Sequence, residues 1–220
     1  MRLDRLIIKK EDKSLFTKNL TPGITYYKEK LVNIGGEEYR HWSPYRSKLA
    51  AAILNGLNVK ELEGVNTVLY LGAATGTTIS HISDLLPDGR IYAVEVAPRV
   101  MLEFINRVIR YRNNIIPLYF DARKPYFYQD IVETVDLVYC DVAQPDQTEI
   151  AAYNCDIFLK KGGKLLLAVK SRSIDVTKDP NVIYRQEANY LRKRGYKVKQ
   201  IIDLEPYEKD HAMIYALKEK

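Results

Sequence analysis

Acidic and basic side chains stand at the ends of several short apolar segments of the sequence. Glu95, Asp121 and Asp141 each follow a run of apolar or aromatic residues, and Lys170 closes another. If these runs are parallel strands, their carboxyl ends share one edge of a sheet, where ligands bind. His211 opens the last apolar run, which a short loop should make antiparallel, so it reaches the same edge. We expect one site in which carboxylates, an amine and an imidazole hold a ligand and move a proton.

A glycine loop lies upstream of Glu95. Residues 68–71 (VLYL) predict a strand buried on both faces, Gly72 and Gly76 bracket a loop of small residues, and a helix and a second strand follow. Glycines let backbone N–H groups approach a nucleotide closely, and an acid after the second strand can bind a ribose diol. Ala74 breaks the dinucleotide pattern, and no lysine follows Gly76 as in a P-loop. S-adenosylmethionine, which has adenosine but no phosphates, fits better; a tight turn without a ligand is the alternative.

Strands and helices alternate from residue 65 onward, which predicts a doubly wound, mostly parallel α/β sheet. One helix should pack through Met101, Ile105 and Val108, and another, residues 146–160, should stop at the glycine pair 162–163. Seven strands are expected, the last antiparallel, at residues 68–71, 90–94, 114–120, 135–140, 164–169, 197–204 and 212–217.

Residues 1–42 differ from the rest of the chain. They contain short, tyrosine-rich, partly alternating segments separated by TPG and NIGG turns, which predict a small antiparallel sheet of three to five strands. We therefore expect a small β-rich domain at 1–42 and a larger domain at 43–220. Ser43, followed by Pro44, is expected to cap a helix that carries Lys48.

The composition is that of an ordinary globular protein, with 46% hydrophobic and 28% charged residues in 220. The longest apolar runs are too short to cross a membrane, and the charged start of the sequence does not resemble a signal peptide. We therefore expect a cytoplasmic protein without membrane contacts. Cys140 and Cys155 are too far apart for a CxxC motif and are expected to be buried. No metal site is expected, because the sequence has no His/Cys cluster.

Positive charge is concentrated in one part of the chain. The net charge is +6, yet residues 160–199 hold 12 Lys/Arg against 3 Asp/Glu, which leaves the rest of the chain net negative. Such a block is either a solvated face or a surface that binds a polyanion.

Individual residues also allow simpler interpretations. Asp121 could only cap the next helix, and Lys170 could extend along the sheet edge with its amine in solvent. We assign His81, on the helix after the glycine loop, to packing or to the surface.

Longer motifs resemble the fibrillarin family of RNA ribose 2′-O-methyltransferases. They are HWSPYRSKLAAAI, VLYLGAATGTTISHISD, YAVEVAPR, NIIPLYFDAR, DVAQPDQ, VKSRSID and PYEKDHA, and they cover nearly the whole chain from residue 41. The resemblance implies a Rossmann-like S-adenosylmethionine-dependent methyltransferase sheet after a small N-terminal antiparallel β domain. The low glycine content suggests the archaeal form, without a Gly/Arg-rich tail.

The resemblance also implies a set of site residues. S-adenosylmethionine would contact the glycine loop and the loops after the next strands, and a catalytic set would lie beside it. The implied cofactor contacts are Gly72, Ala73, Gly76, Thr77, Thr78, Glu95, Val96, Asp121, Ala122, Asp141, Val142, Ala143 and Gln144, and the implied catalytic set is Lys48, Asp141, Lys170 and His211.

The implied partners are a Nop-domain scaffold protein, a C/D-box guide RNA, a kink-turn-binding ribosomal-type protein and the rRNA or tRNA substrate, with a role in pre-rRNA and tRNA processing. A lysine that is removed from solvent among other cations can lose its proton, so we expect Lys170, oriented by Asp141, to be the general base. Two alternatives are a binding subunit that does not methylate and a small-molecule methyltransferase. All four catalytic side chains are present, which argues against the first, and the basic block argues against the second.

Overall fold

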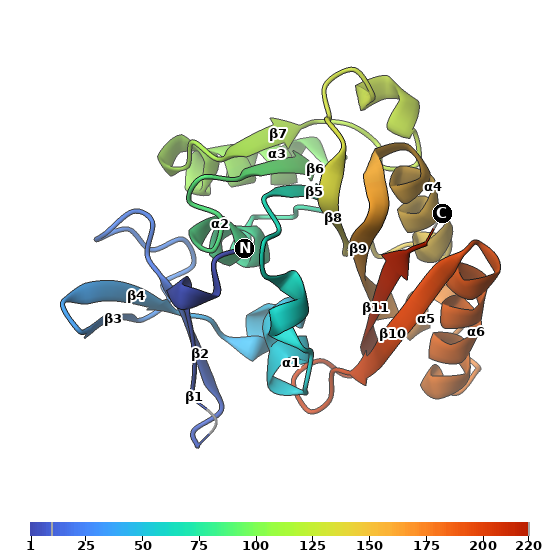
Figure 1. Ribbon diagram of the computed structural model, residues 1–220, viewed down its shortest axis with the longest axis horizontal. Helices are drawn as coiled ribbons and strands as arrows, with labels where there is room; N and C mark the ends of the chain where they lie inside the picture. The colour runs from blue at the N-terminus through green and yellow to red at the C-terminus, as the bar shows by residue number, and fades with distance from the viewer. Residues whose placement is uncertain (10, 220) are drawn as a thin grey trace.

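The computed structural model describes residues 1–9 and 11–219 and contains two β-sheets of different size (Figure 1). The smaller sheet is antiparallel, as residues 1–42 predicted, with four strands in the order β1-β2-β4-β3. Its strands are β1 (Leu6–Lys9), β2 (Ser14–Lys18), β3 (Leu31–Ile34) and β4 (Glu37–His41).

The larger sheet has seven strands in the order β10-β11-β9-β8-β5-β6-β7. Its last strand, β11, pairs antiparallel with both β9 and β10, whereas β5 to β9 run parallel. The expected α/β sheet with an antiparallel last strand is therefore confirmed. Its strands are β5 (Thr67–Leu71), β6 (Arg90–Val94), β7 (Ile115–Leu118), β8 (Val135–Cys140), β9 (Leu159–Lys170), β10 (Tyr196–Asp203) and β11 (His211–Lys218).

Helices cover both faces of the larger sheet. Because successive side chains of a strand point to opposite faces, Tyr70 of β5 joins the core on one side and Leu69 the core on the other. β5 is thus buried on both faces, as its unbroken apolar run predicted. The first face is covered by α1 (Lys48–Leu54), α2 (Thr77–Asp84) and α3 (Pro98–Arg107), and the second by α4 (Gln147–Phe158), α5 (Ser171–Ile174) and α6 (Pro180–Lys193).

The helix that carries Lys48 begins later than expected. Pro44–Arg46 form a short 3₁₀ turn, and Ser47, not Ser43, is the cap of α1. The Ser47 hydroxyl accepts a hydrogen bond from the Ala50 N–H at 3.3 Å. Either serine suits a cap by residue type, and the intervening turn decides between them. Lys48 is therefore the first residue of α1.

The glycine pair 162–163 lies inside a strand rather than at the end of a helix. α4 ends at Phe158, and β9 begins at the next residue. The pairing of β8 with β9 jumps from Leu159 to Lys164, so the residues between them form a bulge. Gly162, with a φ of +73°, suits that irregularity.

Two details of α3 and β7 differ from the expectation by one or two residues. Met101 and Val108 are buried as expected, but Ile105 is 37% exposed and Phe104 is fully buried in its place. Spacings of three and four residues both fit one face of a helix, so the sequence did not separate Phe104 from Ile105. β7 ends at Leu118, two residues earlier than expected.

A buried cluster of charges joins the small sheet to α2. The Arg40 side chain is fully buried, and its Nε donates to a Glu29 carboxylate oxygen at 2.6 Å. Its Nη1 donates to Asp84 at 2.9 Å, and the guanidinium of Arg112 lies 2.7 Å from the other oxygen of Asp84. Because each carboxylate has a guanidinium partner, the charges can remain buried. The division of the chain at residue 42 stays a prediction.

His81 is a packing residue of the same junction. Its ring stacks on Trp42 with centroids 4.9 Å apart, and its nitrogens lie 2.7 Å from the Thr17 hydroxyl and 2.6 Å from the Tyr27 hydroxyl. Burial, together with the nearby Arg40 guanidinium, holds the pKa of His81 well below its usual value of 6.5.

Both cysteines belong to the core. Both cysteines are free and buried, and burial raises the pKa of Cys140 to about 12. Within residues 1–9 and 11–219, no helix has the length and apolarity needed to cross a membrane. Over the same residues, no group of three or more His, Cys, Asp or Glu side chains is arranged to hold a metal ion.

We expect the free energy of unfolding to fall as the pH drops below 6.5. Unfolded His81 binds a proton near pH 6.5, whereas the buried ring does not, so acid favours the unfolded chain. One such histidine contributes a slope of about 1.4 kcal/mol per pH unit. Denaturant titrations at several pH values between 5 and 7.5 should show a steeper slope for the wild type than for His81→Gln. Equal slopes would contradict this account.

Candidate active site

The charged residues at predicted strand ends lie along the carboxyl edge of the seven-stranded sheet. Glu95 follows β6, Asp141 follows β8, and Asp121 lies three residues beyond β7. Lys170 ends β9, and its cross-strand partner in β11 is His211. The expected convergence of these strand ends on one edge is therefore confirmed.

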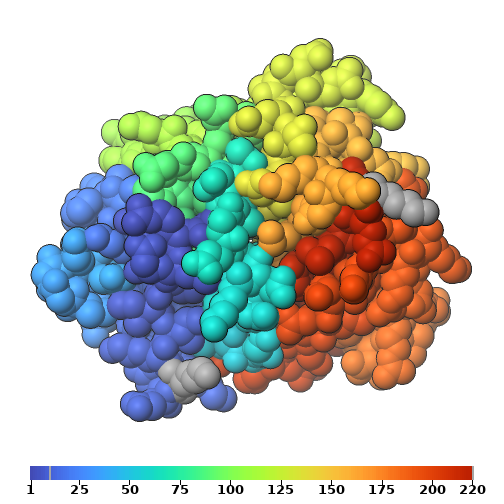
Figure 2. All heavy atoms as spheres, in the orientation of Figure 1, coloured from blue at the N-terminus to red at the C-terminus, as the bar shows by residue number. Residues whose placement is uncertain are grey.

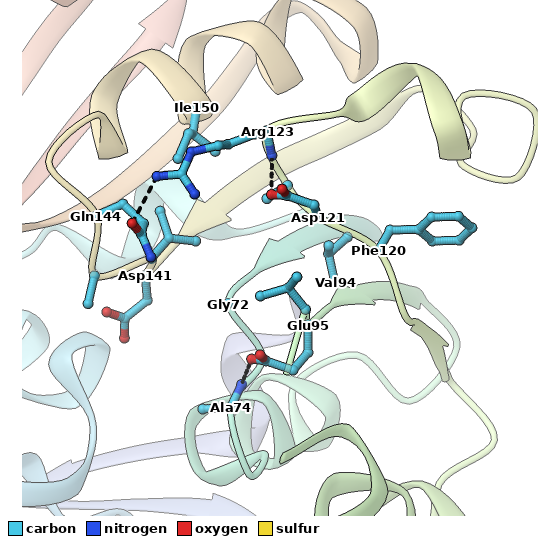
Figure 3. Close-up of a pocket in the computed structure, with 14 residues that line it drawn as sticks. Gly72, Ala74, Val94, Glu95, Phe120, Asp121, Arg123, Asp141, Gln144 and Ile150 are labelled. Atoms are coloured by element: carbon cyan, nitrogen blue, oxygen red, sulfur yellow. Dashed lines mark hydrogen bonds between the residues drawn. The ribbon is translucent and has the colours of Figure 1, made fainter. Parts of the chain in front are cut away.

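Two adjoining cavities open along this edge and share Gly72, Ala74 and residues 141–143. One, the Glu95 pocket, has a volume of about 180 Å³ and is also lined by Val94, Glu95, Val96, residues 120–123, Gln144 and Ile150 (Figure 3). The other, the Lys48 cavity, has a volume of about 300 Å³ and is also lined by Arg46, Lys48, Tyr70, Ala73, Thr75, Thr77, Thr78, Lys170, Glu208 and His211.

The predicted site residues divide between these cavities. All four members of the predicted catalytic set line the Lys48 cavity. The predicted cofactor contacts are spread over both, and one of them lines neither. Glu95, Val96, Asp121, Ala122 and Gln144 line the Glu95 pocket alone, Gly72, Asp141, Val142 and Ala143 line both cavities, Ala73, Thr77 and Thr78 line the Lys48 cavity alone, and Gly76 lines neither.

The two cavities meet because the loops after β5 and β8 touch at Gly72. Its φ is +81°, and a Cβ there would lie 2.7 Å from the carbonyl oxygen of Asp141. The Asp141 N–H donates to the carbonyl of Leu71 at 2.9 Å, so the contact is between backbones. Gly76 has a different role: a Cβ there would lie 2.5 Å from the ring of Phe104, so this glycine lets α2 pack against α3.

Glu95 is held in place by two backbone N–H groups. One carboxylate oxygen accepts from Ala74 at 2.9 Å (Figure 3), and the other accepts from Ala97 at 2.9 Å. Ala74 has a φ of +48°, which is unusual for a residue other than glycine, and the bond to Glu95 stabilises that conformation. Each carboxylate oxygen can still accept a further hydrogen bond from a ligand.

Arg123 is a residue of the Glu95 pocket that sequence reasoning missed. Its guanidinium donates to both carboxylate oxygens of Asp146, at 2.9 and 2.8 Å, and to the side-chain oxygen of Gln144 at 2.8 Å. The available signal was the motif NIIPLYFDAR, which ends on this arginine. Asp121 accepts from the Arg123 backbone N–H at 2.9 Å, so its carboxylate shapes the turn from which Arg123 extends.

Asp141 is paired with Lys48. The Lys48 amine lies 3.0 Å from one carboxylate oxygen and 3.3 Å from the other, and both side chains are about one-fifth exposed. Among the described residues, no ion pair joins Asp141 to Lys170, although both line the Lys48 cavity. The expectation that Asp141 orients Lys170 therefore stays a prediction.

The backbone of Lys170 is held by Gln147, a fully buried residue at the start of α4. The Gln147 side-chain oxygen accepts from the Lys170 N–H at 2.9 Å, and its amide donates to the Lys170 carbonyl at 3.2 Å. These bonds extend the sheet past Cys140, where β8 ends. Sequence reasoning also missed Gln147, although it is the last residue of DVAQPDQ.

His211 has one ring nitrogen, Nε2, that makes no hydrogen bond to the described residues. Its Nδ1–H donates to the carbonyl of Lys209 at 2.7 Å, so Nε2 carries the lone pair. Burial lowers the pKa of His211, and the charge of Lys48 adds to that shift. His211 shares a face of β11 with the core residues Met213 and Tyr215, which is the face that α1 covers.

The basic block at 160–199 is not one continuous surface. Lys164 and Lys170 stand six residues apart on β9, about 20 Å along an extended strand. Several of its side chains are also paired with acids, such as Lys160 with Asp136 and Arg194 with Asp156. A polyanion surface that used the whole block does not fit this distribution.

Comparison with known proteins gives a consistent result. The Fibrillarin family model matches residues 5–220. A fibrillarin-like rRNA/tRNA 2′-O-methyltransferase from Staphylothermus marinus is 55% identical over 213 residues, which are 96% of this chain and 91% of the relative.

Two solved structures are also similar. A crystal structure of Aeropyrum pernix fibrillarin with natively bound S-adenosyl-L-methionine has a TM-score of 0.85 and 49% identity, covering 94% of this chain and 90% of that one. A crystal structure of a fibrillarin/Nop5p complex has a TM-score of 0.86 and 42% identity, covering 97% of both chains.

We expect Gly72→Ala to destabilise the protein more than Gly162→Ala. Both glycines have positive φ, so alanine is strained at either position, by roughly 1–2 kcal/mol. A Cβ at Gly162 meets nothing within 4 Å, whereas one at Gly72 collides with the Asp141 carbonyl, which adds about 1–3 kcal/mol. Denaturant unfolding of the two variants measures the difference. Equal losses would show that the close approach at Gly72 is not required.

Proposed function

The chain belongs to the fibrillarin family, and from this premise we propose that it transfers a methyl group from S-adenosylmethionine to the ribose 2′-hydroxyl of rRNA and tRNA. The observation that carries the proposal is the junction of the two cavities at Gly72 and Asp141. A cofactor in the Glu95 pocket can reach that junction, and a ribose in the Lys48 cavity can meet it there.

The residues of the Glu95 pocket suit an adenosine ligand. Glu95 keeps acceptor capacity for two ribose hydroxyls, one on each carboxylate oxygen. Val96, Ala122 and Ile150 supply apolar surface for the base. When bound, S-adenosylmethionine supplies an electrophilic methyl group.

The residues of the Lys48 cavity suit an RNA strand. Arg46 and Lys48 bring two positive charges to one cavity, which attracts phosphate. The Lys48–Asp141 pair fixes the position of one ammonium group, so it can donate to a ribose or phosphate oxygen without reorganisation. Lys170 and His211, side by side on β9 and β11, are the groups able to take the hydroxyl proton.

Transfer of radiolabel from S-adenosylmethionine tests this function. Label should enter the 2′-O-methyl groups of RNA in the presence of partner proteins and guide RNA, and it should not enter small metabolites. Cofactor and RNA binding without transfer would favour a non-catalytic binding subunit. Transfer to metabolites alone would favour a small-molecule methyltransferase.

The partners follow from the family. A Nop-type scaffold protein and an RNA substrate are supported by the fibrillarin/Nop5p complex and by the relatives that are named for rRNA and tRNA. We further propose a C/D-box guide RNA, which would choose the methylated nucleotide, and a kink-turn-binding protein. The cytoplasmic location stays a prediction from the sequence.

We expect Glu95→Ala to weaken binding of S-adenosylmethionine by about 1–3 kcal/mol, because the ribose hydroxyls lose their acceptor. The Ala74 N–H also loses its partner, so the loop itself is less ordered. Isothermal titration calorimetry on the isolated chain measures the loss. Glu103→Ala, on the exposed side of α3, should bind as the wild type does. Unchanged affinity in Glu95→Ala would remove Glu95 from the cofactor site.

We propose Lys170 as the general base and expect Lys170→Arg to lower the methylation rate by about 10²–10⁴-fold. Arginine keeps the charge but does not give up its proton near neutral pH. Single-turnover methylation in the assembled particle, with cofactor and RNA binding measured separately, gives the rate. Lys178→Arg, an exposed residue paired with Asp175, is the control. A near-normal rate for Lys170→Arg would make Lys170 a phosphate clamp instead.

A further inference from the structure

Arg123 connects the two walls of the Glu95 pocket. It belongs to the loop after β7, which also contributes Asp121 and Ala122 to the pocket. Its guanidinium donates to the Gln144 side-chain oxygen at 2.8 Å (Figure 3) and forms a fork with the Asp146 carboxylate, at 2.9 and 2.8 Å. Gln144 and Asp146 both lie on the loop after β8. These contacts therefore link one wall of the Glu95 pocket to the other.

The Asp146 carboxylate binds Arg123 and does not cap α4. It stands at the N-cap of α4, where an aspartate usually accepts from the first turn of the helix, yet its side chain makes no capping hydrogen bond. Both carboxylate oxygens face Arg123 instead. A residue that departs from its usual local role in this way is often found at a functional site.

Arg123 also borders a second hollow beside the Glu95 pocket. Arg123 and Ile150 line both the Glu95 pocket and a neighbouring hollow, to which Asp146, Glu149 and Tyr153 contribute. The Arg123 side chain is 41% exposed and that of Asp146 is 37% exposed, so the pair can open without unfolding either loop. Opening of the pair would displace one of the two side chains that line both spaces.

We propose that Arg123 is a positioning residue that holds the two walls of the Glu95 pocket together and thereby slows the departure of the cofactor. The proposal rests on the function proposed above, because it takes S-adenosylmethionine and its product as the ligands of this pocket. Arg123 would act through Gln144 and Asp146 and need not contact the ligand. The exchange of product for fresh cofactor would then require the ion pair to open.

A direct contact between Arg123 and the ligand is the competing account, and Asp146 separates the two. Asp146 lies outside the Glu95 pocket, so its removal affects the ligand only through the ion pair. If Arg123 bound the ligand directly, Asp146→Asn would free the guanidinium for that contact and would slow departure or leave it unchanged.

The test is the dissociation rate of radiolabelled S-adenosylhomocysteine from the isolated chain after addition of excess unlabelled compound. Arg123→Gln and Asp146→Asn should each speed dissociation by about three- to tenfold, the size expected for one exposed, bidentate ion pair. The double variant should be no faster than the faster single variant, because both changes remove the same contact. Arg185→Gln, an exposed arginine on α6, is the matched control and should match the wild type.

Salt provides a second readout, since S-adenosylhomocysteine has no net charge near neutral pH. Raising the salt concentration from about 0.05 to 0.5 M screens an exposed pair and should speed dissociation from the wild type more than from the double variant. A merely structural role for Arg123 would not give this difference.

Wild-type rates in both single variants, or faster dissociation in Arg123→Gln alone, would overturn the proposal while the methyltransferase function stood. Additive effects in the double variant would overturn it as well. A wild-type chain that did not bind S-adenosylhomocysteine would overturn the proposed function together with this inference.

Discussion

The contact between the loops after β5 and β8 is the constraint on which the site depends. Gly72 lets the backbone of one loop lie against the Asp141 carbonyl of the other, and the Leu71–Asp141 hydrogen bond fixes the distance. The two cavities adjoin at these loops and share Gly72, Ala74 and residues 141–143 in their linings. Asp141 then faces both cavities, and its pairing with Lys48 ties α1 to the same point.

The small sheet supports this arrangement from the far end of α2. Arg40 of β4 is bonded to Asp84 at the end of α2, and the first residues of the same helix, Thr77 and Thr78, line the Lys48 cavity. The Thr78 hydroxyl also donates to Ser47, the cap of α1, at 3.0 Å. Side-chain hydrogen bonds thus tie α2 to the small sheet and to the start of α1. The N-terminal segment therefore takes part in the geometry of the site.

Much of this could be predicted from the sequence, because it follows from local rules. Strand ends in a parallel sheet share an edge, so Glu95, Asp141 and Lys170 could be placed together before any coordinates. The pairing of Lys48 with Asp141 could not, since it depends on how α1 docks across 93 residues of chain. The same holds for the fork between Arg123 and Asp146 and for Gln147, whose local patterns are those of an ordinary turn and helix start. The choice of Ser47 over Ser43 also needed the intervening turn.

The register of β11 has a consequence for how this chain tolerates changes in length. Lys170 and His211 face each other because β9 and β11 are aligned without interruption over seven residue pairs. An insertion or deletion of one residue within the paired segments, residues 164–170 and 211–217, would turn the side chains beyond it to the opposite face and separate the pair. The connection between β10 and β11, at residues 204–210, is not constrained in this way, because it does not alternate between the faces of the sheet. Length variation among related chains should therefore collect in connections of this kind and be excluded from these paired segments.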